Sequence, residues 1–138
     1  MAPTLDFISL VVDDLARAAA FYRDGFGISE ESITAEQDHV RIEFENEVTL
    51  VLYARSSFEK QFGDLVASSR AGGVILSRTV EAKNDVEALI RRAISAGGSQ
   101  AGSPEEQDWG GYAGYFQDPD RHLWEVVWNP DWQLKFEA

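Results

Sequence analysis

One order of secondary structure is predicted twice along this chain of 138 residues, and it constrains the fold more than any other feature. In each half, the spacing of apolar residues predicts a strand, then a helix, then three further strands. The first half has strands near 5–12, 28–35, 40–44 and 48–53, and the second half has strands near 73–80, 99–101, 112–116 and 123–128. This divergent repeat predicts an α+β fold made of two βαβββ modules.

The repeat also sets the expected domain organisation, which is a single domain over residues 1–138. In chain order its parts are module one at about 4–54, a connection at 55–72, module two at about 73–130 and a C-terminal tail at 131–138. The connection is long for a loop, which indicates a lid or a crossover between the halves. Within it, Phe58, Phe62 and Leu65 are spaced for a short helix. In the tail, alternate apolar residues beginning at Trp132 indicate docking, with a partner subunit as one candidate surface.

Both predicted helices carry an apolar stripe at helical spacing. In module one, Asp13 or Asp14 caps the start of the helix, and Gly25 or Gly27 ends it. In module two, the helix is predicted at about 84–96. Each stripe predicts that its helix covers one face of the sheet in the same module. The stripe residues are Leu15, Ala18, Ala19 and Tyr22 in the first helix and Val86, Leu89, Ile90, Ala93 and Ile94 in the second.

The last two predicted strands are joined by an Asp-Pro-Asp turn at 118–120. Proline presets φ in such a turn, and aspartate accepts hydrogen bonds from its own backbone. The strand after the turn carries one carboxylate, Glu125, among apolar neighbours, where an ionised group is costly unless it has a partner or a function. Three interpretations are open. Glu125 is a structural carboxylate paired with Arg78 or Arg41, or it recognises a cationic or hydrogen-bond-donating ligand, or it acts as a general base with a pKa raised by desolvation.

Composition excludes several kinds of site and partner. The chain has no cysteine, which removes disulfides, thiolate metal ligands and cysteine nucleophiles. Its formal net charge of −12 opposes binding to nucleic acid. Residues 1–12 lack the pattern of a signal peptide, and no apolar run approaches the ~20 residues that cross a bilayer. We therefore expect a cytoplasmic protein with neither a nucleic acid nor a membrane as its partner.

Two segments are typical of one protein family. The segments Gly111–Pro130 and Val11–Gly27 resemble the vicinal oxygen chelate superfamily, the group of glyoxalases, bleomycin resistance proteins and extradiol dioxygenases. Together with the module order, the resemblance covers nearly the whole chain and is strongest to small glyoxalase-like members. It implies that each module curls into a half-barrel and that the two half-barrels enclose a cavity. Arg121 departs from the pattern, because the family usually has glycine at that turn position.

Metal-binding members of that family place four ligands in the cavity, one on the first and one on the last strand of each module. Their metal acts as a Lewis acid. By position, the resemblance assigns these four places to Phe7, Val51, Ile75 and Glu125. Only Glu125 carries an atom that binds a metal, so we expect neither the family metal site nor any other cofactor. The family often has histidine at the position of His122 without using it as a ligand.

Without a metal, the cavity is predicted to be a mostly apolar pocket with a few polar groups, which is typical of a small-molecule site. Its expected lining is Phe7, Ser9, Val51, Tyr53, Ile75, Ser77, Leu123 and Glu125, with Tyr112 or Tyr115 and, at the rim, Trp109. The alternative is that these side chains fill a core, where serines and Glu125 would be unusual. Alternation places Trp124 and Trp128 on the opposite face, towards the helices.

Three functional hypotheses follow. The first is a protein that binds a small molecule without a metal, with a cationic or aromatic ligand suited to the acidic charge. The second is an enzyme: a lyase, isomerase or dioxygenase with unusual metal ligands, or a metal-free enzyme that uses Glu125 as its catalytic group. The third is an interaction domain whose barrel is filled. We also expect a homodimer, because the sheet edges of half-barrels need covering. The two modules pair either within one chain or between two.

Overall fold

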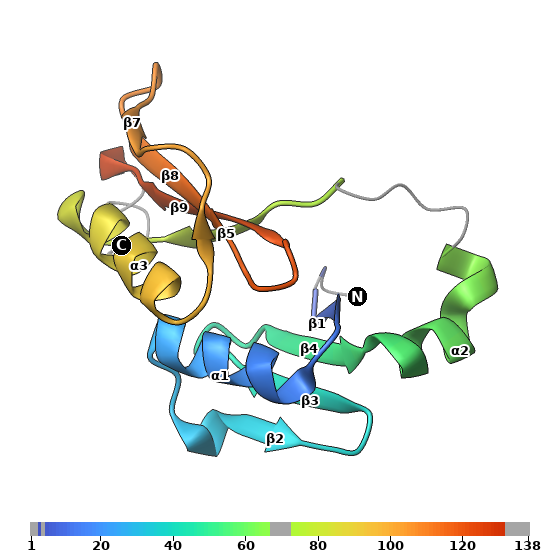
Figure 1. Ribbon diagram of the computed structural model, residues 1–138. Coiled ribbons are helices and arrows are strands. Elements are labelled where there is room, and N and C mark those ends of the chain that lie inside the picture. The colour runs from blue at the N-terminus through green and yellow to red at the C-terminus, as the bar shows by residue number, and fades with distance from the viewer. Residues whose placement is uncertain (1–2, 4, 67–72, 132–138) are drawn as a thin grey trace. The chain divides into compact units, whose positions relative to one another are not determined.

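The computed structural model describes residues 3, 5–66 and 73–131. It divides into two compact units, Met1–Ala71 and Gly72–Ala138, each built on one open sheet of mixed strand direction (Figure 1). The described residues form three α-helices, and the helices and sheets confirm the predicted α+β fold of βαβββ modules. No helix in the described part of the chain is long and apolar enough to cross a membrane.

The sheet of the first unit contains β1 (Phe7–Val12), β2 (Ile33–Ala35), β3 (His39–Glu43) and β4 (Thr49–Ala54). Its strand order is β1-β4-β3-β2, with β1 parallel to β4 and the other neighbours antiparallel. The strand predicted at 28–35 is shorter than expected, because Glu30–Ser32 form a 3₁₀ turn (η1) before β2. The other three strands lie where the sequence predicts them, within two residues at each end.

Helix α1 (Leu15–Phe26) covers one face of this sheet, and both of its ends are set locally. Asp14 is the N-cap, and its carboxylate accepts a hydrogen bond from the backbone N–H of Arg17 at 3.0 Å. Gly27 ends the helix with a φ of 70°, in the left-handed region that glycine favours. Each end therefore uses one of the two residues proposed for it. The buried apolar residues between helix and sheet are Leu10, Val12, Ala18, Phe21, Tyr22, Val40, Ile42, Leu50 and Leu52.

The second unit contains β5 (Leu76–Thr79), α3 (Asn84–Ser95), β6 (Ser99–Gln100), β7 (Glu105–Glu106), β8 (Tyr112–Gln117) and β9 (Leu123–Trp128). The strand order is β5-β9-β8-β6, with β5 parallel to β9, and β7 also pairs with β8. The strand predicted at 73–80 was too long at its start, since β5 begins at Leu76. The sequence did not predict β7, because two adjacent glutamates are poor strand formers and the strand pairs through its backbone.

The core of the second unit lies between α3 and one face of its sheet. Phe116 and Trp124 stack with their ring centroids 6.1 Å apart and their planes 2° from parallel. Trp124 is 5% exposed, which confirms its predicted place in the core. Gly114 lets α3 approach this face, because a Cβ there would lie 2.6 Å from Cδ1 of Ile90. The other buried apolar residues of this unit include Leu76, Val86, Ala93 and Val126.

The connection predicted at 55–72 begins as a helix, α2 (Arg55–Val66). The rings of Phe58 and Phe62, two of the residues predicted to form its apolar side, lie 5.2 Å apart between centroids. The helix predicted there is confirmed over this range. The rest of the connection and the tail from Trp132 onwards lie outside the described residues, so their roles as a lid and as a docking segment stay predictions.

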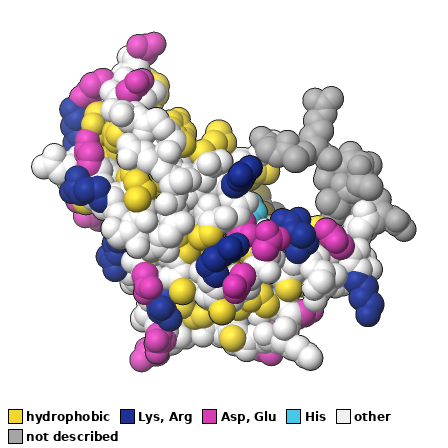
Figure 2. All heavy atoms as spheres, in the orientation of Figure 1, with side chains coloured by type: hydrophobic (Ala, Val, Ile, Leu, Met, Phe, Trp, Pro, Cys, Tyr) yellow, Lys and Arg dark blue, Asp and Glu magenta, His cyan; other side chains and the backbone are white. Residues whose placement is uncertain are grey.

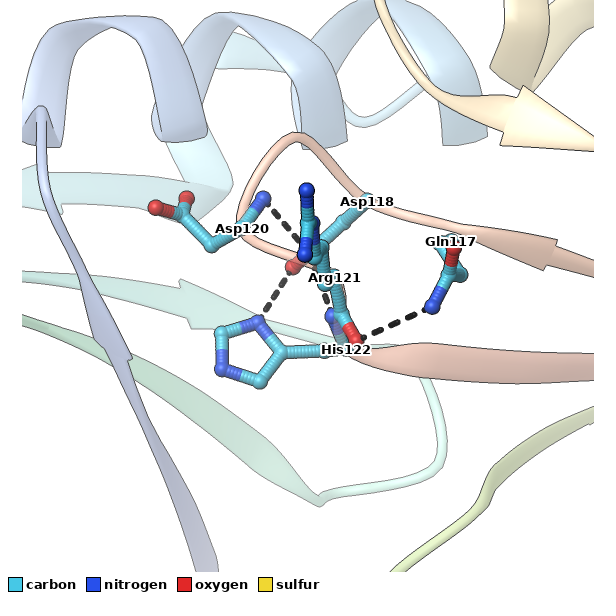
Figure 3. Close-up of polar contacts among 5 residues, drawn as sticks. All are labelled: Gln117, Asp118, Asp120, Arg121 and His122. Carbon is cyan, nitrogen blue, oxygen red and sulfur yellow. Dashed lines mark hydrogen bonds and ion pairs between the residues drawn. The ribbon is translucent and has the colours of Figure 1, made fainter. Parts of the chain in front are cut away.

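The turn between β8 and β9 is organised around Asp118, which is 3% exposed (Figure 3). Its Oδ1 accepts hydrogen bonds from the backbone N–H of Asp120 at 2.9 Å and of His122 at 2.8 Å. Its Oδ2 lies 2.7 Å from Nδ1 of the His122 ring. The prediction that an aspartate accepts hydrogen bonds from its own backbone at this turn is confirmed, and the first of the two aspartates does so.

Arg121 stands in this turn where the resemblance predicts glycine, and its φ is 69°. A side chain in this left-handed conformation costs ~1 kcal/mol, part of which is offset because arginine restricts the unfolded chain more than glycine does. We therefore expect Arg121→Gly to raise the free energy of unfolding by roughly 0.5–1 kcal/mol in urea titrations. The turn keeps the hydrogen bond from Gln117 Nε2 to the Arg121 carbonyl, which belongs to the backbone. A less stable variant would contradict this prediction.

Candidate functional site

Glu125 lies at the centre of a small polar cluster on the second unit's sheet. Its register partners are Ser77 on β5 and Tyr115 on β8, so the three side chains stand side by side on one face. The Ser77 hydroxyl donates to Oε1 of Glu125 at 2.9 Å. The Tyr115 hydroxyl donates to Oε2 at 3.1 Å. Each oxygen of the carboxylate thus accepts a hydrogen bond from one neutral hydroxyl group. We call Ser77, Tyr115 and Glu125 the Glu125 cluster.

The cluster lies on the sheet face opposite α3. Strand alternation places Trp124 and Val126 on the face that packs against α3, and Glu125 between them points the other way. Within the described residues, Glu125 makes no ion pair. Arg78, one of the two arginines considered as its partner, donates instead to the carbonyl oxygen of Thr79. The carboxylate is therefore held by hydroxyl groups rather than by a cation.

The cluster changes the acidity of its tyrosine. Burial, with a further contribution from the hydrogen bond to the Glu125 carboxylate, raises the pKa of Tyr115 above its usual value of 10.0. Both causes favour the protonated phenol, because burial and a neighbouring anion each disfavour a phenolate. The Tyr115 hydroxyl therefore keeps its proton, and keeps donating it to Glu125, throughout the neutral pH range.

Titration of Tyr115 tests this cluster directly. We expect Glu125→Gln to lower the pKa of Tyr115 towards 10.0, while burial still holds it above that value. The folded-state pKa is raised, so the stability linked to this proton is complete below about pH 10 and is lost at higher pH. Tyrosinate absorbance gives the measurement, and comparison with Tyr115→Phe assigns the signal. Identical Tyr115 titrations in the wild type and in Glu125→Gln would contradict the arrangement.

The other predicted site residues of the second unit do not all lie on the sheet face of Glu125. Leu123 shares the face of Glu125 and is half-buried. Ile75 precedes β5 and is 56% exposed. Tyr112 lies on the α3 side, where its hydroxyl donates to Glu87 of that helix. Trp109 is half-exposed in the segment before β8. Of the two tyrosines proposed for the site, the register therefore brings Tyr115, and not Tyr112, beside Glu125.

The predicted site residues of the first unit share one face of its own sheet. The register aligns Ser9 with Val51, and alternation adds Phe7 and Tyr53 to the same face, opposite α1. Phe7 is 61% exposed, whereas Val51 is 7% exposed. His39 is the β3 register partner of Tyr53, and the two ring centroids lie 5.5 Å apart. The alternation predicted from the sequence therefore agrees with the register within this unit.

Two pairs of aspartate and histidine were not predicted from the sequence. Nδ1 of His39 lies 2.7 Å from Oδ1 of Asp38, and this hydrogen bond is the main cause of the lowered pKa of Asp38. Nδ1 of His122 is held in the same way by Asp118. The adjacent Asp-His residues and the Asp-x-x-x-His spacing across the turn were the signals in the sequence. Both histidines of the chain thus have one ring nitrogen occupied by a carboxylate.

The residues at the four family metal positions do not suit a metal ion. The aliphatic side chains of Val51 and Ile75 and the ring of Phe7 offer no lone pair, which leaves one carboxylate, Glu125. The described residues contain no group of three or more His, Asp or Glu side chains arranged to hold a metal ion. The chemistry of the chain at these positions therefore differs from that of a chelating member.

The acidic side chains on one face of the protein are spread out rather than clustered. On the face that Figure 2 shows, Asp and Glu side chains are interspersed with Lys and Arg instead of gathering into one patch. Several carboxylates are paired locally, such as Asp13 with Arg55 and Asp24 with Arg23. The pKa of Asp13 is lowered chiefly by its hydrogen bond to Arg55. The net charge alone therefore does not mark a site on this face.

Comparison with known proteins supports the resemblance noted from the sequence. The family model described as Glyoxalase/Bleomycin resistance protein/Dioxygenase superfamily matches residues 4–126. A glyoxalase-related enzyme from Fulvimarina pelagi is 27% identical, with a TM-score of 0.81 over 94% of this chain and 90% of that one. No curated protein matches the sequence.

Two further solved structures have lower identity and show the fold alone. A glyoxalase/bleomycin resistance protein/dioxygenase family enzyme from Burkholderia phytofirmans is 18% identical, with a TM-score of 0.77 over 89% of this chain and 96% of that one. Lactoylglutathione lyase from Agrobacterium tumefaciens is also 18% identical, with a TM-score of 0.68 over 95% and 97% of the two chains. The match in fold thus extends over nearly the full length of both chains.

Proposed function

We propose that this chain, which belongs to the Glyoxalase/Bleomycin resistance protein/Dioxygenase superfamily, binds a small molecule through Glu125 and does so without a metal ion. The observation that carries the proposal is the state of the Glu125 carboxylate. It is partly exposed, it is held by two hydroxyl groups, and within the described residues it has no cationic partner. A carboxylate in that state remains able to accept hydrogen bonds from a ligand.

The residue chemistry of both units supports binding that does not depend on a metal. Apolar side chains stand at three of the four family metal positions, and one of them, Phe7, is largely exposed on its sheet. Pockets for small molecules are usually apolar with a few polar groups that orient the ligand. The faces that carry Phe7 and Glu125 have this mixture, each within its own unit. Ser9 and Ser77 supply hydroxyls on the respective faces.

A ligand screen tests the proposal. We expect compounds that raise the melting temperature of the wild type to do so equally in chelator-treated and metal-supplemented protein. Glu125→Gln should remove most of the shift for compounds that contact the carboxylate, while the melting temperature without ligand changes little. A library that stabilises neither protein, or stabilisation that requires added metal, would refute the proposed function.

The second candidate function is an enzyme of the same superfamily, and one observation favours it. The 27% identical relative from Fulvimarina pelagi is described as a glyoxalase-related enzyme. A metal-dependent lyase, isomerase or dioxygenase would have to retain stoichiometric metal after purification. A metal-free enzyme would use Glu125 as its base, because that carboxylate can accept a proton. The homodimer, the cytoplasmic location and the filled interaction domain stay predictions from the sequence.

A further inference from the structure

We infer that the Glu125 cluster recognises a planar nitrogen cation, an amidinium or guanidinium group, on the bound molecule. The inference rests on the proposed function and narrows it to one class of ligand. It depends on the direction of the hydrogen bonds within the cluster, on the lone pairs that those bonds leave free, and on the charges that share the sheet face.

Both hydrogen bonds within the cluster are donated to the carboxylate. An ionised carboxylate only accepts, so Ser77 and Tyr115 must both donate their hydroxyl protons to Glu125. Each hydroxyl has one proton, and that proton is used within the cluster. Towards a ligand, the three side chains therefore present oxygen lone pairs and no polar hydrogen. A ligand carboxylate, phosphate or carbonyl oxygen finds no donor among them.

The Glu125 carboxylate keeps acceptor positions that its two hydroxyl partners do not use. A carboxylate has about four lone-pair positions, two on each oxygen. Ser77 occupies one position on Oε1 of Glu125, and Tyr115 occupies one on Oε2. One position on each oxygen is left, which makes a two-point acceptor. Amidinium and guanidinium groups carry two parallel N–H donors at the spacing of a carboxylate, and such bidentate pairs are strong.

The described strands place no cationic side chain on the sheet face around the cluster. The register places the following residues on the same face as Glu125: Ser77, Thr79, Ser99, Glu105, Ala113, Tyr115, Gln117, Leu123 and Val127. None of these residues is a lysine or an arginine, so the described strands supply no internal cation. Lys83, the nearest lysine in sequence to β5, pairs with Glu106. A cation from the ligand would therefore supply the missing counter-charge of Glu125.

Leu123, the apolar neighbour of the cluster, indicates the shape of the ligand. Leu123 lies two residues before Glu125 on the same strand face and is half-buried. A flat hydrocarbon attached to the cation can lie against Leu123 while the N–H groups of the cation reach the Glu125 carboxylate. Benzamidine combines these two parts, and benzamide and benzoate keep its shape with a neutral and an anionic head group.

The test compares the affinities of these three probes by calorimetry and by amide chemical shifts of the full chain. We expect benzamidine to bind at least about tenfold more tightly than benzamide or benzoate, a difference of ~1.4 kcal/mol. Glu125→Gln should weaken benzamidine binding by at least about tenfold, because it replaces the anionic acceptor with a neutral amide. Glu105→Gln on β7 is the matched control, since it removes the same charge from an exposed position on the same sheet face but outside the cluster.

Several results would overturn the inference. No binding of benzamidine, equal binding of the three probes, or equal loss of affinity in Glu125→Gln and Glu105→Gln would each do so. The double variant Ser77→Ala with Tyr115→Phe provides a second test of the inference. It keeps the charge of Glu125 but removes the two hydroxyl groups that hold the carboxylate in place. It should retain cation preference with a weaker affinity. If library compounds without a cation bind the metal-free protein while benzamidine does not, the inference fails and the proposed function stands.

Discussion

Asp118→Ala should lower the free energy of unfolding by about 3 kcal/mol, because each buried group that loses its partner costs 1–3 kcal/mol. The carboxylate accepts two backbone N–H groups and faces the Nδ1 of His122, all within the turn that joins β8 to β9. Alanine leaves these groups without their acceptor at a position that is 3% exposed. Urea unfolding followed by tryptophan fluorescence gives the measurement.

Two variants show which part of that interaction matters. Asp118→Asn keeps an oxygen for the backbone N–H groups, so its loss should be less than half that of alanine. His122→Ala removes only the imidazole from Oδ2 and should also cost less than Asp118→Ala. If Asp118→Ala lost under 1 kcal/mol, the carboxylate would not organise the turn as the structure indicates.

Gly111→Ala should strongly destabilise the protein, because a Cβ at this position has no room. The added Cβ would lie 2.6 Å from the carbonyl oxygen of Trp128 and within 2.2 Å of two carbons of the Trp109 ring. The ring can rotate away, but the Trp128 oxygen belongs to the backbone of β9 and can retreat only if the strand moves. Overpacking of this kind costs roughly 1–3 kcal/mol, and we expect the upper end of that range in urea unfolding.

Gly63→Ala is the matched control for that substitution. Gly63 lies within α2, and a Cβ there meets nothing within 4 Å. Alanine is the better helix former by roughly 0.5–1 kcal/mol, so the same chemical change should stabilise the protein at this position. Equal effects of the two substitutions would show that the contact at Gly111 does not restrict the strand.

The local signals in the sequence predicted most of the fold. Asp14 and Gly27 fix the ends of α1 through their own side chain and backbone, so no distant residue is needed to place them. Strand β7 was missed because its glutamates pair through the backbone with β8, and their side chains carry no pattern. The start of β5 was placed too early, because the apolar Val74 and Ile75 precede the strand and are exposed.

The candidate site was predicted in part. Alternation correctly placed Ser77 on the face of Glu125, because strand periodicity alone decides on which face each of these two side chains lies. The choice between Tyr112 and Tyr115 needed the pairing register of β8 with β9, which alternation within one strand does not give. The partner of Glu125 could not be identified either, since hydroxyl donors from neighbouring strands replace the arginine that charge alone suggested.

We propose above that this chain binds its small molecule without a metal ion. Elemental analysis of the purified protein tests it most directly, before and after incubation with divalent metals and removal of the excess. The account predicts far less than one ion per chain in both samples, because Phe7, Val51 and Ile75 leave Glu125 as the single donor among the family positions. One retained ion per chain that is lost in Glu125→Ala would contradict the account and favour a metal-dependent enzyme.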